Sequence, residues 1–209
     1  MPDITPLFST PIYRDKIFFV DKEKSFINDK LPHLNYQGYD SGNGKTTKEK
    51  NFLDRRIFRR IKCEIVEHVK NYAFNVLQLK EINLYITSSW INKHDSGDFA
   101  QAHVHCNSIF SGVLYLDVPN ENCGKLIFHA PHSLPTFMTT TIFPDVENDN
   151  IYNSRSWSMN PVSEDLFIFP SHLLHSVERN NSYQSRFSLS FNCFVKGNVS
   201  DVKTMELNI

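Results

Sequence analysis

The sequence predicts an α+β domain in which helices lie on one side of a jelly roll, also called a double-stranded β-helix. Between residues 48 and 79, apolar residues recur at about every fourth position, which is typical of an amphipathic helix. From residue 81 onward, apolar and polar residues alternate in about eight short segments that Gly, Pro and Asn separate. Helices followed by many short strands indicate a two-sheet β-sandwich or jelly roll with helices packed beside it.

The first eighty residues contain the predicted helices. A short strand within residues 7–20 precedes a short helix that Asp21 can cap and that ends before Pro32. A polar, glycine-rich stretch over residues 35–44 is expected to be a loop, because it lacks the Lys-Ser/Thr ending of a phosphate-binding loop. The long helix over residues 48–79 follows. We expect its apolar face to support the sheet and its arginine-rich face to be solvated.

The strands form the remainder of the predicted fold. A long strand begins near residue 81, and further candidates lie at residues 102–106, 109–118, 125–129, 137–143, 155–160, 165–169, 174–178 and 185–195. No internal repeat or long linker divides the chain. The prediction is therefore a single domain over residues 1–209, with an N-terminal strand and helices (1–80), a jelly-roll core (81–195) and a C-terminal tail (196–209).

Composition excludes some classes of function. A net charge of −1 with 22% charged residues gives no electrostatic argument for nucleic-acid or membrane-surface binding. No apolar run approaches the ~18 residues that a membrane span needs. The four cysteines show no paired spacing and no signal peptide precedes them, so we expect reduced thiols in the cytoplasm. The sequence does not predict the oligomeric state.

Two histidines, His103 and His105, are separated by one residue. On a β-strand both side chains point to the same face, with Cα atoms about 6.6 Å apart. Both imidazoles can then reach one metal ion at about 2.0–2.1 Å, the distance typical of Zn–N bonds. Alone, the pair is equally compatible with two ordinary histidines. A third ligand is available in His175, which opens a later strand, and three imidazoles would leave the opposite coordination positions open.

Eleven residues after His175 comes Arg186-Phe187-Ser188. On a strand, Arg186 and Ser188 share a face. A guanidinium holds a carboxylate through two parallel, charge-assisted hydrogen bonds, and a serine hydroxyl can add a third. The pair therefore predicts a carboxylate-binding position near the candidate metal ligands.

The order of these motifs resembles that of the 2-oxoglutarate- and iron(II)-dependent dioxygenases. The finer similarity, over about residues 85–195, is to a branch of that superfamily with a His-x-His motif, known from bacteria and bacteriophages. The matching segments are Trp90-Ile91-Asn92, His103-Val104-His105, Ser111 to Leu116, Phe169 to His175 and Arg186 to Asn192.

The resemblance implies an activity and a set of site residues. Fe(II) would bind His103, His105 and His175, and 2-oxoglutarate would chelate the metal through its C1 carboxylate and keto oxygen. The far carboxylate of 2-oxoglutarate would pair with Arg186, and three residues would assist or line the same pocket, namely Ser188, Tyr115 and Asn92. The implied enzyme consumes 2-oxoglutarate and O2, releases succinate and CO2, and hydroxylates an unidentified protein side chain or small molecule. Ascorbate is a candidate reductant, and the implied location is the cytoplasm of a bacterium or a phage-infected host.

One residue departs from the superfamily pattern. His105 stands where most members have Asp or Glu, so the bare iron site would carry +2 where a carboxylate would leave +1. Dianionic 2-oxoglutarate would restore neutrality. A histidine also fills the position that a small residue leaves open in the related halogenases, which argues against halogenation.

Two other readings remain open from the sequence. A cupin-type isomerase or 2-oxoglutarate-independent dioxygenase fits Gly97 and His103-x-His105, but its expected glutamate is missing and Arg186 has no role in it. A metal-free jelly-roll binding protein is the third reading. For His94, His129 and His132 we favour ordinary structural roles over places at a pocket mouth. Loops 33–48 and 130–160 are the expected specificity elements.

Overall fold

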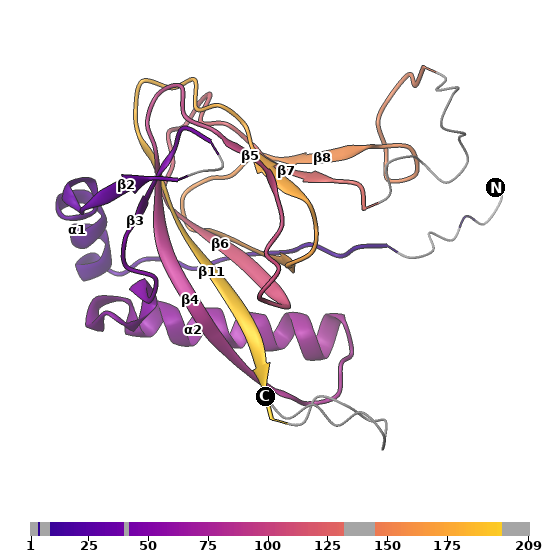
Figure 1. The fold of residues 1–209 in the computed structure, drawn as a ribbon, viewed down its shortest axis with the longest axis horizontal. Coiled ribbons are helices and arrows are strands. Elements are labelled where there is room, and N and C mark those ends of the chain that lie inside the picture. The colour runs from indigo at the N-terminus through magenta and orange to yellow at the C-terminus, as the bar shows by residue number, and fades with distance from the viewer. Residues whose placement is uncertain (1–3, 5–8, 40–41, 132–144, 198–209) are drawn as a thin grey trace.

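The computed structural model describes residue 4 and residues 9–39, 42–131 and 145–197. Its strands form two antiparallel sheets, and the helices cover one face of the larger sheet (Figure 1). The α+β jelly roll predicted from the sequence is confirmed. The larger sheet has the spatial order β1 (Tyr13–Lys16), β9 (Asp165–Pro170), β6 (Phe110–Asp117), β11 (Arg186–Lys196), β4 (Asn83–His94), β3 (Lys45–Thr47) and β2 (Tyr36–Gly38). The smaller sheet has the order β5 (Ala100–His103), β10 (His175–Val177), β7 (Leu126–His129) and β8 (Ser156–Met159).

Strand β11 lies in the middle of the larger sheet, and its alternating residues serve two different surfaces. The odd-numbered residues from Phe187 to Phe191 belong to the core beneath the helices. The even-numbered residues from Arg186 to Ser190 line a cavity between the two sheets. Because side chains of a strand alternate between faces, one strand supplies both an apolar core and a row of polar side chains.

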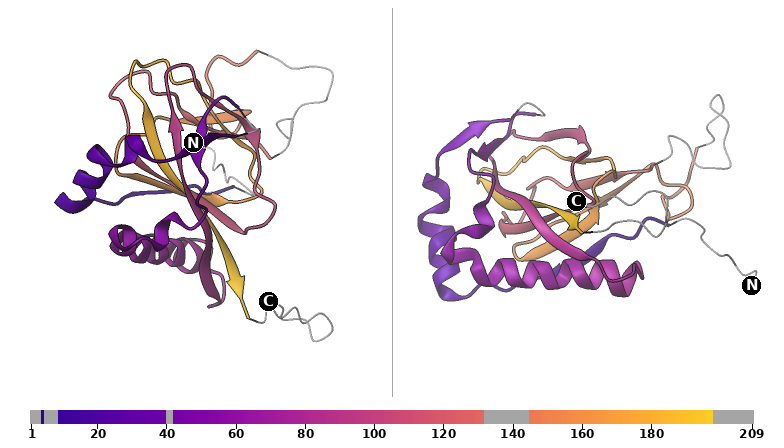
Figure 2. Two further views of the ribbon diagram at one scale, coloured as in Figure 1. Left: turned by 60° about the vertical axis from the view of Figure 1, so that its left-hand side comes forward. Right: turned by 60° about the horizontal axis from the view of Figure 1, so that its bottom comes forward.

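The helices lie on the side of the larger sheet away from the smaller sheet, as two further views show (Figure 2). They are α1 (Asp21–Asp29), the 3₁₀ turn η1 (Leu31–His33) and α2 (Arg59–Lys70). In α2, Ile61, Ile65 and Val69 recur every four residues and are fully buried. This stripe packs on the sheet, so the predicted supporting role of the long helix is correct.

The predicted helix over residues 48–79 is in fact composite. Two 3₁₀ turns, η2 (Phe52–Asp54) and η3 (Arg56–Phe58), precede α2, and a π-helical turn, η4 (Asn71–Val76), follows it. The start of the segment is held by β4 instead of by helical hydrogen bonds. Ser89 donates its backbone N–H to the Lys50 carbonyl at 2.7 Å and accepts the Leu53 N–H at its hydroxyl at 2.8 Å. These bonds replace the helical ladder that the periodicity alone predicts.

The glycine-rich stretch predicted as a loop contains part of a hairpin. Strands β2 and β3 pair with each other, and β3 also pairs with β4, where Thr46 lies opposite Asn92. This pairing extends the larger sheet by two short strands. It also brings the turn between β2 and β3 beside the cavity.

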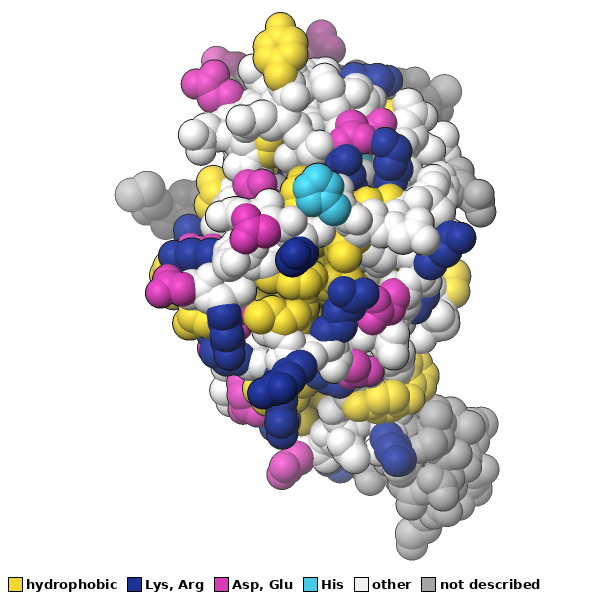
Figure 3. Space-filling model, turned by 90° about the vertical axis from the view of Figure 1, so that its left-hand side faces the viewer, with side chains coloured by type: hydrophobic (Ala, Val, Ile, Leu, Met, Phe, Trp, Pro, Cys, Tyr) yellow, Lys and Arg dark blue, Asp and Glu magenta, His cyan; other side chains and the backbone are white. Residues whose placement is uncertain are grey.

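Opposite charges neutralise one another on the arginine-rich face of the helical segment. Arg55 bonds Glu49, while Arg60 bonds both the buried Glu23 and Glu64. Figure 3 shows basic and acidic side chains interspersed on the face at the left of Figure 1. The expectation of a solvated face agrees with these pairs. In the described part of the chain, no helix is long and apolar enough to span a membrane.

Candidate functional site

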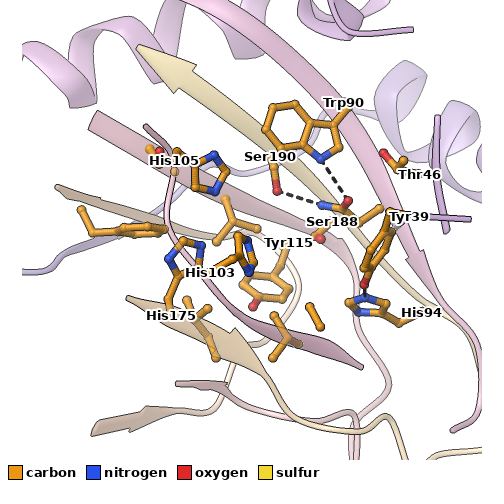
Figure 4. A pocket seen from close by; sticks show the side chains of 18 of the residues that line it. Tyr39, Thr46, Trp90, His94, His103, His105, Tyr115, His175, Ser188 and Ser190 are labelled. Carbon is orange, nitrogen blue, oxygen red and sulfur yellow. Dashed lines mark hydrogen bonds between the residues drawn. The ribbon is translucent and has the colours of Figure 1, made fainter. Parts of the chain in front are cut away.

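Three histidines converge in the cavity between the sheets, as Figure 4 shows. His103 at the end of β5 lies directly opposite His175 at the start of β10. Their ring centroids are 4.4 Å apart, and the His105 ring lies 5.3 Å from the first and 5.2 Å from the second. One nitrogen from each ring lies within 4.8 Å of the other two. The three candidate ligands predicted from the sequence are therefore brought together.

Backbone carbonyls fix the proton positions of two of these rings. The Nδ1 atoms of His103 and His175 lie 2.8 Å and 2.9 Å from the carbonyl oxygens of Gln101 and Leu173. A carbonyl can only accept, so each Nδ1 carries the proton and each Nε2 keeps its lone pair. This arrangement leaves Nε2 as the free donor atom, as is common for metal-binding histidines.

His105 follows the end of β5 and is held by different neighbours. Its backbone N–H donates to the Ser171 carbonyl at 2.9 Å. Its ring stacks on Trp90, with a centroid distance of 6.0 Å and an interplanar angle of 23°. A hydrogen bond to the side chain of Asn192 also reaches this ring. Both the backbone and the ring of His105 are thus fixed.

All three rings suit a divalent metal ion. Burial, with repulsion from His103, lowers the pKa of His175 to about 3 and that of His105 to about 4, so both are neutral at neutral pH. Neutral imidazole is a ligand for Fe, Zn, Cu and Ni. One nitrogen of each ring lies within 4.8 Å of the other two, so the three rings could bind one ion together. The residues therefore fit a transition metal.

Arg186 supplies a cation at the other part of the same cavity, where it is only 2% exposed. Its Nη1 atom donates to the carbonyls of Cys123 and Gly124, both at 2.9 Å. Its Nη2 atom contacts Nδ1 of His94, and its Nε has no partner among the described residues although it is buried. A guanidinium has five N–H donors, so these contacts leave two unused. Two free donors are what one carboxylate takes.

The other three predicted residues lie around this guanidinium. Ser188 pairs across the sheet with both Tyr115 and Asn92. The Tyr115 ring centroid is 5.9 Å from the guanidinium carbon, and burial raises the pKa of Tyr115 to about 12, which keeps its hydroxyl protonated. All seven residues predicted from the sequence line one cavity of about 320 Å³.

Asn92 lines the pocket as expected and also holds a neighbouring side chain. Its amide oxygen accepts from Trp90 Nε1 at 3.0 Å, and its amide nitrogen donates to Ser190 at 2.8 Å (Figure 4). These bonds use the amide oxygen and one of the two N–H groups of the amide. Asn92 therefore holds the indole that stacks on His105.

Sequence reasoning missed three residues of this cavity. His94 was given an ordinary structural role, yet it is 4% exposed and contacts Arg186. Thr46 has a buried hydroxyl without a partner among the described residues, and the Lys50 ammonium lies 5.3 Å from the Trp90 ring centroid. All three depend on the pairing of β3 and β11 with β4, for which the sequence carries no local signal. His129, by contrast, bonds Ser176 as a structural histidine, and His132 lies outside the described residues.

Comparison with known proteins adds a family and a fold. A family model described as "putative 2OG-Fe(II) oxygenase" matches residues 88–192. The structure is similar to a prolyl-4-hydroxylase from Pseudomonas putida, at 14% identity over 89% of this chain and 94% of that chain, with a TM-score of 0.57. It is also similar to HygX from Streptomyces hygroscopicus, solved with nickel, 2-oxoglutarate and hygromycin B (10% identity, 88% and 83% covered, TM-score 0.60). A third similar structure is that of the α-ketoglutarate-dependent epimerase SnoN from nogalamycin biosynthesis, at 13% identity over 88% of this chain and 76% of that chain, with a TM-score of 0.61. At these identities the structural likenesses show the fold, and no curated protein matches the sequence.

Proposed function

This chain belongs to the 2OG-Fe(II) oxygenase family, and from this membership we propose that it hydroxylates a C–H bond of a second substrate. Fe(II) and 2-oxoglutarate are the cofactor and cosubstrate of the family, and O2 is consumed while succinate and CO2 are released. Bound in the cavity, Fe(II) and 2-oxoglutarate supply the O2-activating chemistry. The side chains of this protein bind and orient both groups.

We propose that His103, His105 and His175 hold the iron. Support comes from the convergence of their nitrogens within 4.8 Å and from the carbonyls that direct two Nε2 atoms away from the backbone. The lowered pKa values of His105 and His175 support the same role, because protons do not compete with the metal at these two rings near neutral pH.

We propose that Arg186 binds the far carboxylate of 2-oxoglutarate, with Ser188 and the Tyr115 hydroxyl beside it. The observation that carries the proposal is that two unused guanidinium donors and three converging imidazoles share one cavity. None of the described residues lining that cavity is Asp or Glu. A dianion therefore enters a pocket whose fixed charges are cationic.

The experiment that tests the function measures succinate formed from 2-oxoglutarate with and without Fe(II). The wild type should form succinate only with Fe(II), and His175→Ala should remove this turnover together with metal binding. His172→Ala is the matched control, because His172 belongs to the same segment but is exposed.

Calorimetric titration with 2-oxoglutarate separates the alternatives. A cupin-type metalloprotein would bind metal but not 2-oxoglutarate, and a metal-free binding protein would bind neither. Either result in the wild type would contradict the proposed function. Succinate formation that survives in His175→Ala would contradict only the assignment of that ligand.

A further inference from the structure

A line of polar contacts runs from Arg186 to the turn between β2 and β3. Arg186 lies opposite His94 across β11 and β4, and its Nη2 atom contacts Nδ1 of that ring. On the other side of the ring, Nε2 contacts the Tyr39 hydroxyl, which reaches the Phe99 carbonyl at 3.3 Å. Figure 4 shows Tyr39 and His94 with this contact. The contacts link a buried cation on one strand to a turn on another.

The chemistry of the groups fixes the direction of each hydrogen bond. A guanidinium only donates, so Nδ1 of His94 must accept. A neutral imidazole has one acceptor and one donor, so its proton lies on Nε2 and is donated to the Tyr39 oxygen. The Tyr39 hydroxyl proton then goes to the Phe99 carbonyl, which only accepts. One tautomer of His94, with its proton on Nε2, is therefore compatible with all three contacts of the line.

Burial keeps this line in its neutral form. His94 is 4% exposed, and burial together with the charge of Arg186 lowers the pKa of His94 to about 3. Burial also raises the pKa of Tyr39. A close approach of the turn is possible because of Gly44, where a side-chain carbon would lie 2.2 Å from the Tyr39 hydroxyl and 2.4 Å from His94. The absence of a side chain at Gly44 therefore leaves room for Tyr39 to lie against His94.

His94 determines which donors of Arg186 remain for a ligand. The two carbonyls of Cys123 and Gly124 take both N–H groups of Nη1, and His94 takes one of Nη2. The remaining two, on Nε and Nη2, are therefore the ones free to point into the cavity. Without an acceptor at His94, a third N–H would be left unpaired in a buried place, and the guanidinium would lose one of the contacts that fix its plane.

We propose that His94 is the positioning residue that holds the Arg186 guanidinium for the far carboxylate of 2-oxoglutarate, and that Tyr39 fixes the tautomer in which His94 does so. This inference rests on the proposed function. Neither residue touches the cosubstrate in this proposal. Both act through Arg186.

The test compares the dissociation constants of two ligands for the protein loaded with Co(II) in place of Fe(II). One ligand is 2-oxoglutarate, and the other is 2-oxopentanoate, which lacks the far carboxylate. His94→Leu should weaken 2-oxoglutarate binding by about tenfold and leave 2-oxopentanoate and Co(II) affinity unchanged, because it removes one of the hydrogen bonds that hold the charged guanidinium. His94→Asn should restore most of the affinity, since its amide oxygen is attached to Cγ at the position of Nδ1.

Tyr39→Phe removes a single hydroxyl and guards against a His94→Leu protein that does not fold. It should weaken 2-oxoglutarate binding about threefold, with 2-oxopentanoate again unchanged. The inference would be overturned if both His94→Leu and Tyr39→Phe bound 2-oxoglutarate with wild-type affinity. If His94→Leu does not fold, wild-type affinity in Tyr39→Phe alone would overturn it. Equal losses for both ligands would overturn it too, because they indicate a merely structural role. A wild type that binds no 2-oxoglutarate would instead remove the proposed function and the inference with it.

Discussion

The side chain of Asn192 is hydrogen-bonded to the ring of His105 and accepts a second hydrogen bond from the Ser111 hydroxyl at 2.9 Å. Ser111 in turn lies 2.8 Å from the Ser171 hydroxyl, whose residue also accepts the backbone N–H of His105 at its carbonyl. All three supporting residues are at least 96% buried. A closed polar network thus orients the candidate ligand that departs from the superfamily pattern.

We therefore expect Asn192→Ala to weaken metal binding by about tenfold, since outer contacts of metal ligands typically contribute 10–100-fold in affinity. Titration with Co(II) gives the dissociation constant. Asn181→Ala is the control, because Asn181 is exposed and is not among the residues that line the cavity. Unchanged metal affinity in a folded Asn192→Ala protein would mean that His105 does not need this bond.

Arg186→Ala should raise the KM for 2-oxoglutarate by about 30-fold or more, because losing a buried, hydrogen-bonded partner of a carboxylate costs about 2–5 kcal/mol. Arg186→Lys should recover little of this loss. Its single ammonium cannot serve the carbonyls of Cys123 and Gly124 and a carboxylate with the geometry of a planar fork. Turnover in Arg186→Ala at the wild-type KM would show that the far carboxylate binds elsewhere.

The stability of the metal-free protein should fall as the pH decreases from 7.5 to 5. The folded-state pKa of His94 is lowered to about 3, so the unfolded chain binds more protons than the folded chain between pH 6.5 and about 3. The contribution of neutral His94 to the free energy of unfolding is fully present above the pKa of the unfolded state. It is lost as the pH falls, and about 2 kcal/mol of it is gone at pH 5. Urea denaturation at both pH values measures the free energy of unfolding. The decrease should be about 2 kcal/mol smaller in His94→Asn, and an equal decrease in both proteins would contradict this account.

The glycine of the Ser-Gly-Val motif on β6 is Gly112, and its neighbours leave no space for a side chain. A side-chain carbon there would lie 2.3 Å from the Phe191 ring and 2.7 Å from the Phe167 carbonyl. Gly112→Ala should therefore destabilise the fold by about 1–3 kcal/mol, the usual cost of overpacking a core. Gly38→Ala is the matched control, because nothing lies within 4 Å of the added carbon. Equal free energies of unfolding for the two variants would show that β6 can shift without cost.

The sequence predicts most of the strands, and it points to candidate ligands, because these signals are local. Residues with a preference for strands mark β6 and β11. His105 is expected on the same strand as His103, but β5 ends at His103 and His105 lies just beyond it, with the two ring centroids 5.3 Å apart. The register of non-adjacent strands has no such signal. The pairing of β4 with β11 puts His94 against Arg186, and bonds from Ser89 override helical periodicity at the start of the predicted helix. Tertiary contacts thus decide what local patterns leave open.

His105 also allows a test of how charge divides between metal and cosubstrate. With three imidazole ligands the proposed iron site would keep its charge of +2, and the described residues lining the cavity add no carboxylate. A carboxylate at position 105 would attract the metal but repel the dianion beside it. Two unit charges about 4 Å apart interact by roughly 4 kcal/mol at an effective dielectric constant of 20.

We therefore expect His105→Asp to bind Co(II) more tightly than His105→Asn does. We also expect His105→Asp to bind 2-oxoglutarate at least tenfold more weakly than His105→Asn does. The two substitutions have nearly the same shape, so the comparison isolates the charge from the loss of the imidazole. Titrations with Co(II), and then with 2-oxoglutarate on the loaded proteins, give both constants. If the Asp and Asn variants bind 2-oxoglutarate equally, the charge at position 105 does not reach the cosubstrate, which would contradict the proposed place of His105 beside 2-oxoglutarate at the metal.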